Sequence, residues 1–476
     1  MGEAKASAIA GESTPKASAI VGESTKKKLR VRQSFIPSRL DRLPLGKPHF
    51  LVALLSYLVI LFDGMDTMLI SLALPLIGAE FGYSKIELGA IASVGLAAIF
   101  FGALTVCAIA DEKGRKPTMM FTVAMYSIFS AATGAAWNMT SFYVTRFVTG
   151  FGLGGGLPLG GTMTNEIIPT KWRARITGLA VSGFCWGWVL AALIALYVMT
   201  SWGWRWAFYL TILPAILVFF LSFLISESPR WLDIKGRTEE ADKIVSRMEK
   251  KAGIQPFKEG ELQPELIVAA EHTPIKTLFT KDYIVRTGMI FTNFAVNLYA
   301  VYGFSSWMPM QLVAQGYSVA KSFSYTLVIF LGAAIGQSCS GFIMEWMGRR
   351  RALVFNWGMA IVFMLLIAFT PDMSPFQIMF YGFWASFGLV GNQIGMNVYC
   401  GELYPTRIRA TAVGWTNAFG RFGAMMGPIV SAWVVTVTSD ARIFYGIFVV
   451  AMIIMIINTL LFGPETKGKV LEKLSH

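Results

Sequence analysis

Charged residues are scarce in this chain, and histidine and cysteine are scarcer still. Of 476 residues, 14% are charged and 55% are hydrophobic, with three histidines and four cysteines. A soluble protein of this length carries more charge, so the composition indicates an integral membrane protein. The cysteines lie inside apolar stretches without the spacing of a disulfide framework or a zinc site. Because the histidines lie outside the predicted spans, proton chemistry within the membrane must use carboxylates.

Other motifs that the chain lacks exclude several classes of function. The chain has no Gly-x-x-x-x-Gly-Lys-Ser/Thr loop, which argues against ATP-driven transport. It has neither a metal-ligand cluster nor a nucleophile–base set, so we expect no enzymatic activity and no cofactor. The net charge of +13 lies in short basic runs beside apolar segments, which indicates membrane topology and not nucleic-acid binding. Residues 1–49 lack the apolar core of a signal peptide and are predicted to be a disordered basic cytoplasmic tail.

Long apolar segments, by contrast, are abundant. Twelve of them are long enough to cross about 30 Å of hydrocarbon. They are predicted at residues 50–77, 87–110, 117–137, 141–165, 174–199, 206–226, 284–310, 321–345, 351–370, 376–400, 408–437 and 442–463. We therefore expect an all-α membrane protein with twelve transmembrane helices in two pseudo-symmetric six-helix bundles.

The two bundles are expected at residues 50–226 and 284–463, joined by a linker at 227–283 and followed by a tail at 464–476. Apolar residues on one helical face between positions 241 and 248 predict a short helix in the linker. Basic residues are concentrated in every second connection between spans. The positive-inside rule then places the linker and both termini in the cytoplasm, below the plasma (inner) membrane.

Two sequence patterns recur half a chain apart. Residues 101–116 and 335–350 share a glycine, an apolar run, an acid and a Gly-Arg-basic ending, 234 residues apart; residues 166–174 recur at 402–410, 236 residues on. Such a repeat predicts two bundles that face each other across a pathway, as in alternating-access transporters.

The repeated residues are predicted to form an inner gate whose charge pairs exist in one state only. They are Gly102, Asp111, Gly114, Arg115, Lys116, Glu166, Arg173, Glu345, Arg349, Glu402 and Arg407. Asp111 is expected to pair with Arg115 or with bases of the loops between spans 4 and 5 and spans 10 and 11. The equivalent expected neighbours are Glu345 with Arg349, Glu166 with Arg173, and Glu402 with Arg407.

Three charged residues lie inside the spans of the first half. Asp63 and Asp66 are near the middle of span 1, and Arg146 comes to a similar depth in span 4. Inserting a charged side chain at the middle of the bilayer costs roughly 2.5–3.5 kcal/mol, so each of these three residues is expected to have a functional or structural role. Two carboxylates near one arginine make a titratable site, and we interpret them as the proton-coupling site, in which Asp66, either alone or with Asp63, takes a proton and weakens its hold on Arg146. A static ion pair between spans 1 and 4 is the alternative, although the second half has no matching charges.

The second half carries its own arginine, Arg421 in span 11, whose counterpart in the first half is Cys185. Because arginine binds carboxylates in a bidentate fork, Arg421 is predicted to hold an anionic substrate group, with pairing to an acid on another span as the alternative. Amides and aromatic residues of spans 7 and 10 are predicted to contact the rest of the substrate, or else to join helices. They are Asn293, Asn297, Tyr299, Trp307, Asn392, Gln393 and Asn397, with Tyr302 as a further aromatic residue of span 7. Span 5 adds Trp186 and Trp188.

Several motifs resemble those of a known family. GALTVCAIADEKGRK at 102–116, RFVTGFG at 146–152 and GRFGAMMGP at 420–428 resemble the signatures of the major facilitator superfamily, and the likeness extends over residues 50–470. ESPRWL at 227–232 and PETKG at 464–468 resemble its sugar-porter branch, but span 7 lacks the hexose-binding Gln-Gln. FDGMDT in span 1, the Trp-x-Pro of span 7 and the span 11 arginine look more like the aromatic acid:proton symporters. In that family the residues equivalent to Asp63, Asp66, Arg146 and Arg421 are implicated in transport.

The sequence thus predicts a monomeric, proton-coupled symporter in the lipid bilayer that imports a small organic anion, an aromatic acid, by alternating access. A sugar or polyol transporter of the same superfamily is the main alternative, and niacin-like carriers share many of the same features. A passive facilitator would be insensitive to a protonophore, and a membrane receptor would bind its ligand without flux.

Overall fold

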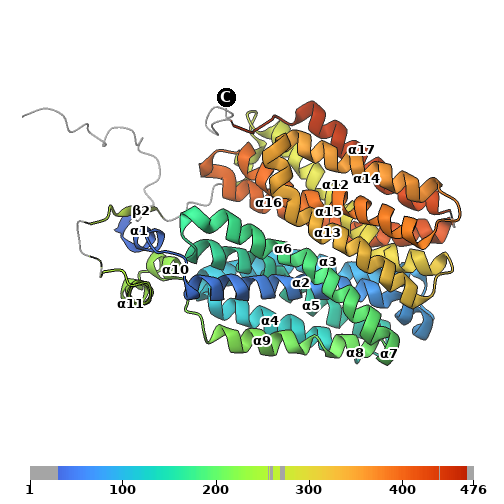
Figure 1. Ribbon diagram of the computed structural model, residues 1–476, viewed down its shortest axis with the longest axis horizontal. Coiled ribbons are helices and arrows are strands. Elements are labelled where there is room, and N and C mark those ends of the chain that lie inside the picture. The colour runs from blue at the N-terminus through green and yellow to red at the C-terminus, as the bar shows by residue number, and fades with distance from the viewer. Residues whose placement is uncertain (1–30, 256, 258–260, 269–273, 439, 469–476) are drawn as a thin grey trace, which may run out of the picture.

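The structure is a computed structural model that describes residues 31–255, 257, 261–268, 274–438 and 440–468. Its long helices form two bundles that lie side by side, confirming the predicted fold class (Figure 1). The first bundle contains α2 (Lys47–Phe81), α3 (Lys85–Lys113), α4 (Arg115–Thr133), α5 (Met139–Ile167), α6 (Thr170–Ile194) with η1 (Ala195–Met199) and α7 (Thr200–Trp202), and α8 (Trp204–Tyr209) with α9 (Ile212–Ser222). The second contains α12 (Ile284–Ala314), α13 (Val319–Met347), α14 (Arg349–Phe369), α15 (Pro375–Leu403), α16 (Thr406–Val437) and α17 (Ala441–Phe462).

Nine helical segments of the described chain are long and apolar enough to cross a membrane by themselves. The other three long helices, α4, α5 and α15, are less apolar because they contain many glycine, hydroxyl and amide residues. Packing inside a bundle tolerates such residues, since neighbouring helices shield them from lipid and satisfy their hydrogen bonds. Together these segments account for the twelve predicted spans.

The bundles contact each other through three helix pairs, α3 with α16, α6 with α13, and α2 with α12. At the end that holds Gly82 and Gly316, here called the far end, the contact is tight. Lys85 Nζ donates a hydrogen bond to the carbonyl oxygen of Val435 at 3.0 Å. A Cβ atom at Gly89 would lie 2.7 Å from the Cβ of Ala432, so only glycine permits this approach.

The opposite end holds the basic loops around Gly114, Pro169, Gly348 and Pro405 and is called the basic end. None of the ion pairs among the described residues joins the two bundles there. Each connects residues within one bundle or connects a bundle to the N-terminal segment. The bundles are therefore held together at the far end, and none of these ion pairs between described residues connects them at the basic end.

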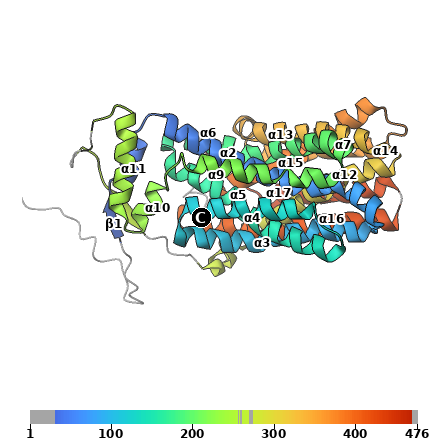
Figure 2. The ribbon, with the colours of Figure 1, turned by 90° about the horizontal axis from the view of Figure 1, so that it is seen from below.

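A cap of short elements lies beyond the basic end, as Figures 1 and 2 both show. It contains β1 (Val31–Ser34), α1 (Ile36–Asp41), α10 (Pro229–Ile234), α11 (Thr238–Lys251) and β2 (Glu265–Val268); η2 (Ile275–Phe279) then leads into α12. β1 pairs antiparallel with β2, Val31 opposite Val268. The predicted disordered tail at 1–49 is therefore wrong for residues 31–46, while residues 1–30 lie outside the described chain. The helix predicted in the linker corresponds to α11, which buries Ala241, Val245 and Met248.

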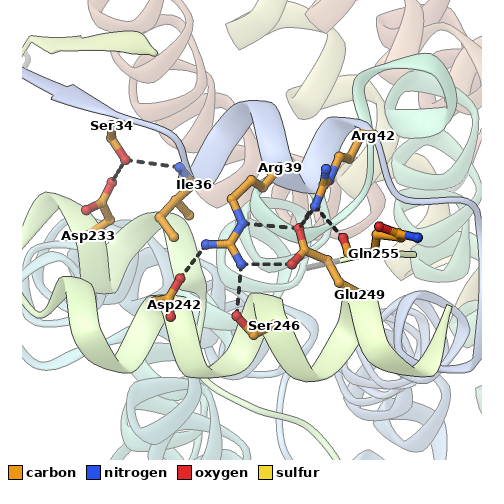
Figure 3. A network of polar contacts seen from close by, with 9 residues as sticks. All are labelled: Ser34, Ile36, Arg39, Arg42, Asp233, Asp242, Ser246, Glu249 and Gln255. Atoms are coloured by element: carbon orange, nitrogen blue, oxygen red, sulfur yellow. Dashed lines mark hydrogen bonds and ion pairs between the residues drawn. The ribbon is translucent and has the colours of Figure 1, made fainter. Parts of the chain in front are cut away.

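A buried charge network orders this N-terminal segment (Figure 3). Arg39, which is 4% exposed, donates from Nε and Nη2 to the two carboxylate oxygens of Glu249 at 3.1 and 2.8 Å. Arg42 Nη2 donates to the same carboxylate at 2.7 Å, and Arg39 also pairs with Asp242. A bidentate, buried arginine–carboxylate pair has a defined geometry, so it docks α1 on α11 in one orientation.

Burial by itself would raise the pKa of Glu249, but the hydrogen bonds from Arg39 and Arg42 outweigh it and lower the pKa below the ordinary 4.5. A carboxyl group whose pKa is lowered by folding stabilises the folded state above its unfolded pKa. That contribution is lost as the pH falls through the lower, folded value. The docking of α1 should therefore persist at neutral pH and weaken only below pH 4.5.

Replacing Glu249 tests this network. Glu249→Gln removes the buried counter-ion of Arg39 and leaves it only the half-exposed Asp242, which should weaken docking by about 3 kcal/mol. Amide hydrogen exchange of residues 36–41 should then rise about 100-fold. Glu240→Gln on the same helix removes a half-exposed pair with Arg237 and should change exchange by less than about fivefold. Equal exchange in the two variants would contradict a docking role for Glu249.

Candidate functional site

The ion pair predicted between spans 1 and 4 is present. Asp66 on α2 and Arg146 on α5 are 0% and 2% exposed, and Arg146 Nη1 lies 3.2 Å from Asp66 Oδ2. Ser130 of α4 donates its hydroxyl hydrogen to the other carboxylate oxygen. Asp66 therefore has a counter-ion and a hydroxyl donor, both from its own bundle. Sequence reasoning missed Ser130, because a single serine in an apolar helix is common.

Asp63, one helical turn earlier on α2, is arranged differently. Its Oδ2 accepts a hydrogen bond from the backbone N–H of Leu157 on α5 at 3.0 Å. A Cβ atom at Gly156 would lie 2.7 Å from that oxygen, so the glycine permits the contact. The arginine that interacts electrostatically with Asp63 is Arg421 of α16, in the other bundle. The expectation that both acids share Arg146 is therefore corrected: each acid has a different arginine.

A row of aromatic rings begins beside this pair of opposite charges, at Tyr302. Arg421 is partly exposed and interacts with the hydroxyl group of Tyr302 on α12. The ring of Trp188 on α6 lies 6.3 Å from the ring of Tyr302 and 5.4 Å from that of Phe330 on α13. The indole N–H of Trp188 is buried without a hydrogen-bond partner among the described residues. An acid, an arginine and a row of rings thus meet at the interface between the bundles.

A second buried hydroxyl group lies on the first-bundle side of this site. Tyr126 of α4 interacts electrostatically with both Asp63 and Asp66, and its hydroxyl oxygen has no partner in the described part of the chain. Sequence reasoning missed Tyr126 and Phe330, because their position at the interface depends on helix rotation. Neither residue belongs to a recognisable motif.

Two of the predicted amides join helices within the second bundle. Asn293 donates to Thr459 Oγ1 and accepts from Asn458 Nδ2, both at 2.7 Å, and these partners lie on α17. Asn392 accepts from Asn356 Nδ2 at 2.8 Å and donates to the carbonyl oxygen of Leu353 at 3.0 Å, both on α14. For Asn293 and Asn392 the structure supports the alternative of helix–helix hydrogen bonding.

The remaining amides form a chain from α12 to α16. Asn297 donates to Gln393 Oε1 at 2.8 Å and accepts from the indole N–H of Trp357 at 3.2 Å. Asn397 accepts from Asn417 Nδ2 at 2.8 Å. Gln393 is partly exposed, and its amide nitrogen has no hydrogen bond among the described residues. Gln393 is thus the predicted amide with a donor still free for a ligand.

The two predicted aromatic residues of α12 lie apart from the charges. The ring of Tyr299 packs 6.0 Å from that of Phe448 on α17, within the second bundle. Trp307 is fully buried and donates its indole hydrogen to the carbonyl oxygen of Pro428 at 2.9 Å. Because Trp307 also lies beside Gly89 of α3, it packs at the far-end contact between the bundles.

The predicted gate residues form two similar clusters at the basic end, with partners other than those expected. Glu166 pairs with Arg115 at 3.1 Å, and Glu402 pairs with Arg349 at 2.7 Å. Arg115 also pairs with Asp111, as predicted. Arg173 pairs with Asp41 of the cap at 3.5 Å and not with Glu166.

Four other predicted gate residues have simpler outcomes. Glu345 is exposed and has no ion pair within the described chain, and the side chain of Arg407 lies outside the described residues. Lys116 donates from Nζ to the carbonyl oxygen of Ile225 at 2.9 Å. At Gly102 a Cβ atom would lie 2.0 Å from the carbonyl oxygen of Phe151, so α3 and α5 pack backbone to backbone there.

Two acids that the sequence did not assign complete these clusters. Glu227 of ESPRWL accepts hydrogen bonds from the backbone N–H groups of Arg115 and Lys116, each at 3.2 Å. Glu465 of PETKG does the same for Arg349 and Arg350, at 2.8 and 3.2 Å. The two acids satisfy free N–H groups at the starts of α4 and α14, where the helix dipole favours negative charge. Gly114 and Gly348, which precede these helices, have φ of +112° and +90°, which favours glycine.

Comparisons of the sequence and of the fold with known proteins identify the family of this chain. The family model described as Major Facilitator Superfamily matches residues 56–424. A niacin transporter of Acinetobacter baylyi is 31% identical, covering 92% of this chain and 99% of that protein. A benzoate transport protein and the 4-hydroxybenzoate transporter PcaK of the same organism are 27% and 26% identical, covering 85% and 82% of this chain and 87% and 85% of their own. A partially occluded, inward-open structure of the E. coli xylose transporter XylE matches with a TM-score of 0.71 at 16% identity, covering 89% of this chain and 100% of that chain, which shows the fold alone.

Proposed function

The chain belongs to the Major Facilitator Superfamily, and from that premise we propose that it imports a small aromatic carboxylate together with protons by alternating access. As a member of this superfamily it is a membrane transporter and not an enzyme. The observation that carries the proposal is the placement of Arg421 in one bundle opposite Asp63 in the other, beside a row of aromatic rings. A ligand bound there contacts both bundles at once.

The substrate class follows from the chemistry of these side chains. A guanidinium group binds a carboxylate through two parallel hydrogen bonds, and partly exposed Arg421 is able to do so. The rings of Trp188, Tyr302 and Phe330 offer stacking and edge contacts to a planar ring. The free amide donor of partly exposed Gln393 is available to ring substituents, and the buried indole N–H of Trp188 is a second donor without a partner among the described residues. Niacin, benzoate and 4-hydroxybenzoate, named for the relatives, each combine a ring with a carboxylate.

Proton coupling follows from the difference between the two acids. Asp66 keeps Arg146 and Ser130 as partners whatever binds at the interface, so it holds α2 against α5. Asp63 has one backbone N–H from its own bundle and otherwise depends on Arg421. When a substrate carboxylate occupies Arg421, Asp63 loses its counter-charge, and a buried carboxylate without a counter-charge takes a proton. The anion and the proton then bind together.

Alternating access is supported by the unequal ends of the bundles. The far end is closed by the hydrogen bond from Lys85 to Val435 and by the close approach of Gly89 to Ala432. At the basic end, Arg115 and Arg349 hold partners within their own bundles. The positive-inside rule assigns this end, with both termini, to the cytoplasm. The structure then corresponds to an inward-facing state of a monomeric carrier in the plasma (inner) membrane, and the gate charges exchange partners when the basic end closes.

The alternative of a sugar or polyol substrate loses its main support in the structure. That alternative came from ESPRWL and PETKG, whose acids cap α4 and α14 at the basic end. Their role there is independent of the chemistry of the cargo. The likeness to the xylose transporter likewise concerns the fold. A neutral sugar would leave Arg421 without a carboxylate to bind.

Uptake into proteoliposomes tests the substrate class. Radiolabelled benzoate, nicotinate and 4-hydroxybenzoate should accumulate under an inward proton gradient, and glucose should not. Arg421→Ala removes charge-assisted hydrogen bonds and should lower aromatic acid uptake about 10- to 100-fold. Arg442→Ala, which changes an exposed arginine at the start of α17, should leave uptake unchanged. Glucose flux that is indifferent to Arg421→Ala would instead establish the sugar alternative.

Replacing the two acids separately tests the coupling. Asp63→Asn keeps an acceptor oxygen for Leu157 but cannot ionise, so the variant should fold, exchange substrate across the membrane and fail to accumulate it. Asp66→Asn leaves Arg146 buried without a counter-ion, which should destabilise the protein by about 3–5 kcal/mol and abolish both activities. Tm, counterflow and gradient-driven uptake distinguish the variants. Accumulation by Asp63→Asn that equals the wild type would exclude Asp63 as the proton carrier.

A further inference from the structure

A cavity of about 1100 Å³ lies at the basic end, outside the interface between the bundles. Its walls come from the start of α2, the segment that follows α9, and one face of α11. Neither the proposed transport site nor the gate clusters use it. We propose that this cavity binds the headgroup phosphate of an anionic phospholipid from the membrane leaflet at the basic end.

The charge of the cavity favours a phosphate. Lys47, His49, Arg247 and Lys251 line it, and none of its described lining residues is an aspartate or a glutamate. Lys47, Arg247 and Lys251 are exposed, and none of the three has an ion pair among the described residues. Arg247 and Lys251 lie one turn apart on α11, where like charges repel each other. A phosphate between them would relieve that repulsion.

A buried hydrogen-bond donor points to the same ligand. His49 is 3% exposed, and its Nδ1 accepts a hydrogen bond from the backbone N–H of Gly46 at 3.2 Å. The proton of the neutral ring is therefore assigned to Nε2. That Nε2 is buried without a partner in the described part of the protein. An unpaired buried donor is costly, and a phosphate oxygen is the acceptor that the basic residues around it would attract.

The apolar part of the cavity indicates a lipid and not a free phosphate. Phe223 and Leu224 line the cavity and are 65% and 62% exposed. They continue the exposed apolar surface of α9, where Phe219 and Phe220 are 50% and 65% exposed. This surface faces the hydrocarbon in a membrane-spanning helix, so it offers a path for acyl chains from the cavity into the bilayer. Basic pockets at the cytoplasmic ends of transmembrane helices bind anionic headgroups in the same way.

A bound lipid would connect two parts of the chain that are far apart in sequence. Lys47 and His49 belong to the first membrane-spanning helix, and Arg247 and Lys251 belong to the cap. The phosphate would therefore attach α11 to the bundle at a point beside the Arg39–Glu249 network. This inference does not depend on the identity of the transported substrate.

Native mass spectrometry of the purified full-length protein tests the site, with phosphatidylglycerol and phosphatidylcholine as probes. The wild type should retain one phosphatidylglycerol in preference to phosphatidylcholine. The double variant Arg247→Gln/Lys251→Gln should bind phosphatidylglycerol about 30-fold more weakly. Lys243→Gln/Lys250→Gln removes the same charge from exposed positions of α11 that do not line the cavity, and it should bind like the wild type.

Three results would overturn the proposal. Equal retention of the two lipids by the wild type would remove the preference for an anionic headgroup. Unchanged binding by Arg247→Gln/Lys251→Gln, with Tm equal to that of the wild type, would place the lipid elsewhere. Displacement of phosphatidylglycerol by millimolar inorganic phosphate would assign the cavity to a free anion and not to a lipid.

Discussion

Burying charge away from water is the constraint on which this structure depends. A buried carboxylate or guanidinium needs a counter-charge and hydrogen bonds, or it must become neutral. The chain satisfies Asp66 completely within the first bundle, through Arg146 and Ser130. It satisfies Asp63 only in part, and the counter-charge comes from Arg421 in the other bundle. The first arrangement is independent of how the bundles move, whereas the second depends on what lies between them.

Some features of the chain occur in both halves of the repeat, and others occur in one half only. At the basic end the two halves are built alike, because Glu227 and Glu465 cap equivalent helices and Arg115 and Arg349 pair with equivalent acids. Inside the membrane the halves differ, since the first carries the acids and the second carries Arg421. In the mechanism that we propose, the duplicated features control the opening of the basic end, and the features present in one half only determine the cargo.

Much of the fold followed from the sequence because its signals are local. Apolar runs of sufficient length predicted the twelve spans, and apolar periodicity predicted α11. Long-range pairing was harder to predict. Glu227 and Glu465 lie more than 100 residues from the helices that they cap, and Arg39 pairs with an acid 210 residues away. No local pattern reports such contacts, so residues 31–46 were expected to be disordered, although a buried ion pair orders them.

The candidate site shows the same limit. Asp66 and Arg146 lie at similar depths in their spans, and this similarity was enough to predict that they would be close to each other. Whether an amide faces a neighbouring helix or the interface depends on helix rotation, which spacing along one helix does not determine. Asn293 and Asn392 therefore turned out to join helices, while Gln393 keeps a free donor. The partner of Asp63 required the relative placement of the two bundles.

Counting protons on substrate binding tests the central claim, that Asp63 takes a proton when an anion occupies Arg421. Titration calorimetry with benzoate in buffers of different ionisation enthalpy measures this number directly. The account predicts the uptake of about one proton per bound anion by the wild type and none by Asp63→Asn. Benzoate binding without proton uptake by the wild type, or with unchanged uptake by Asp63→Asn, would contradict it.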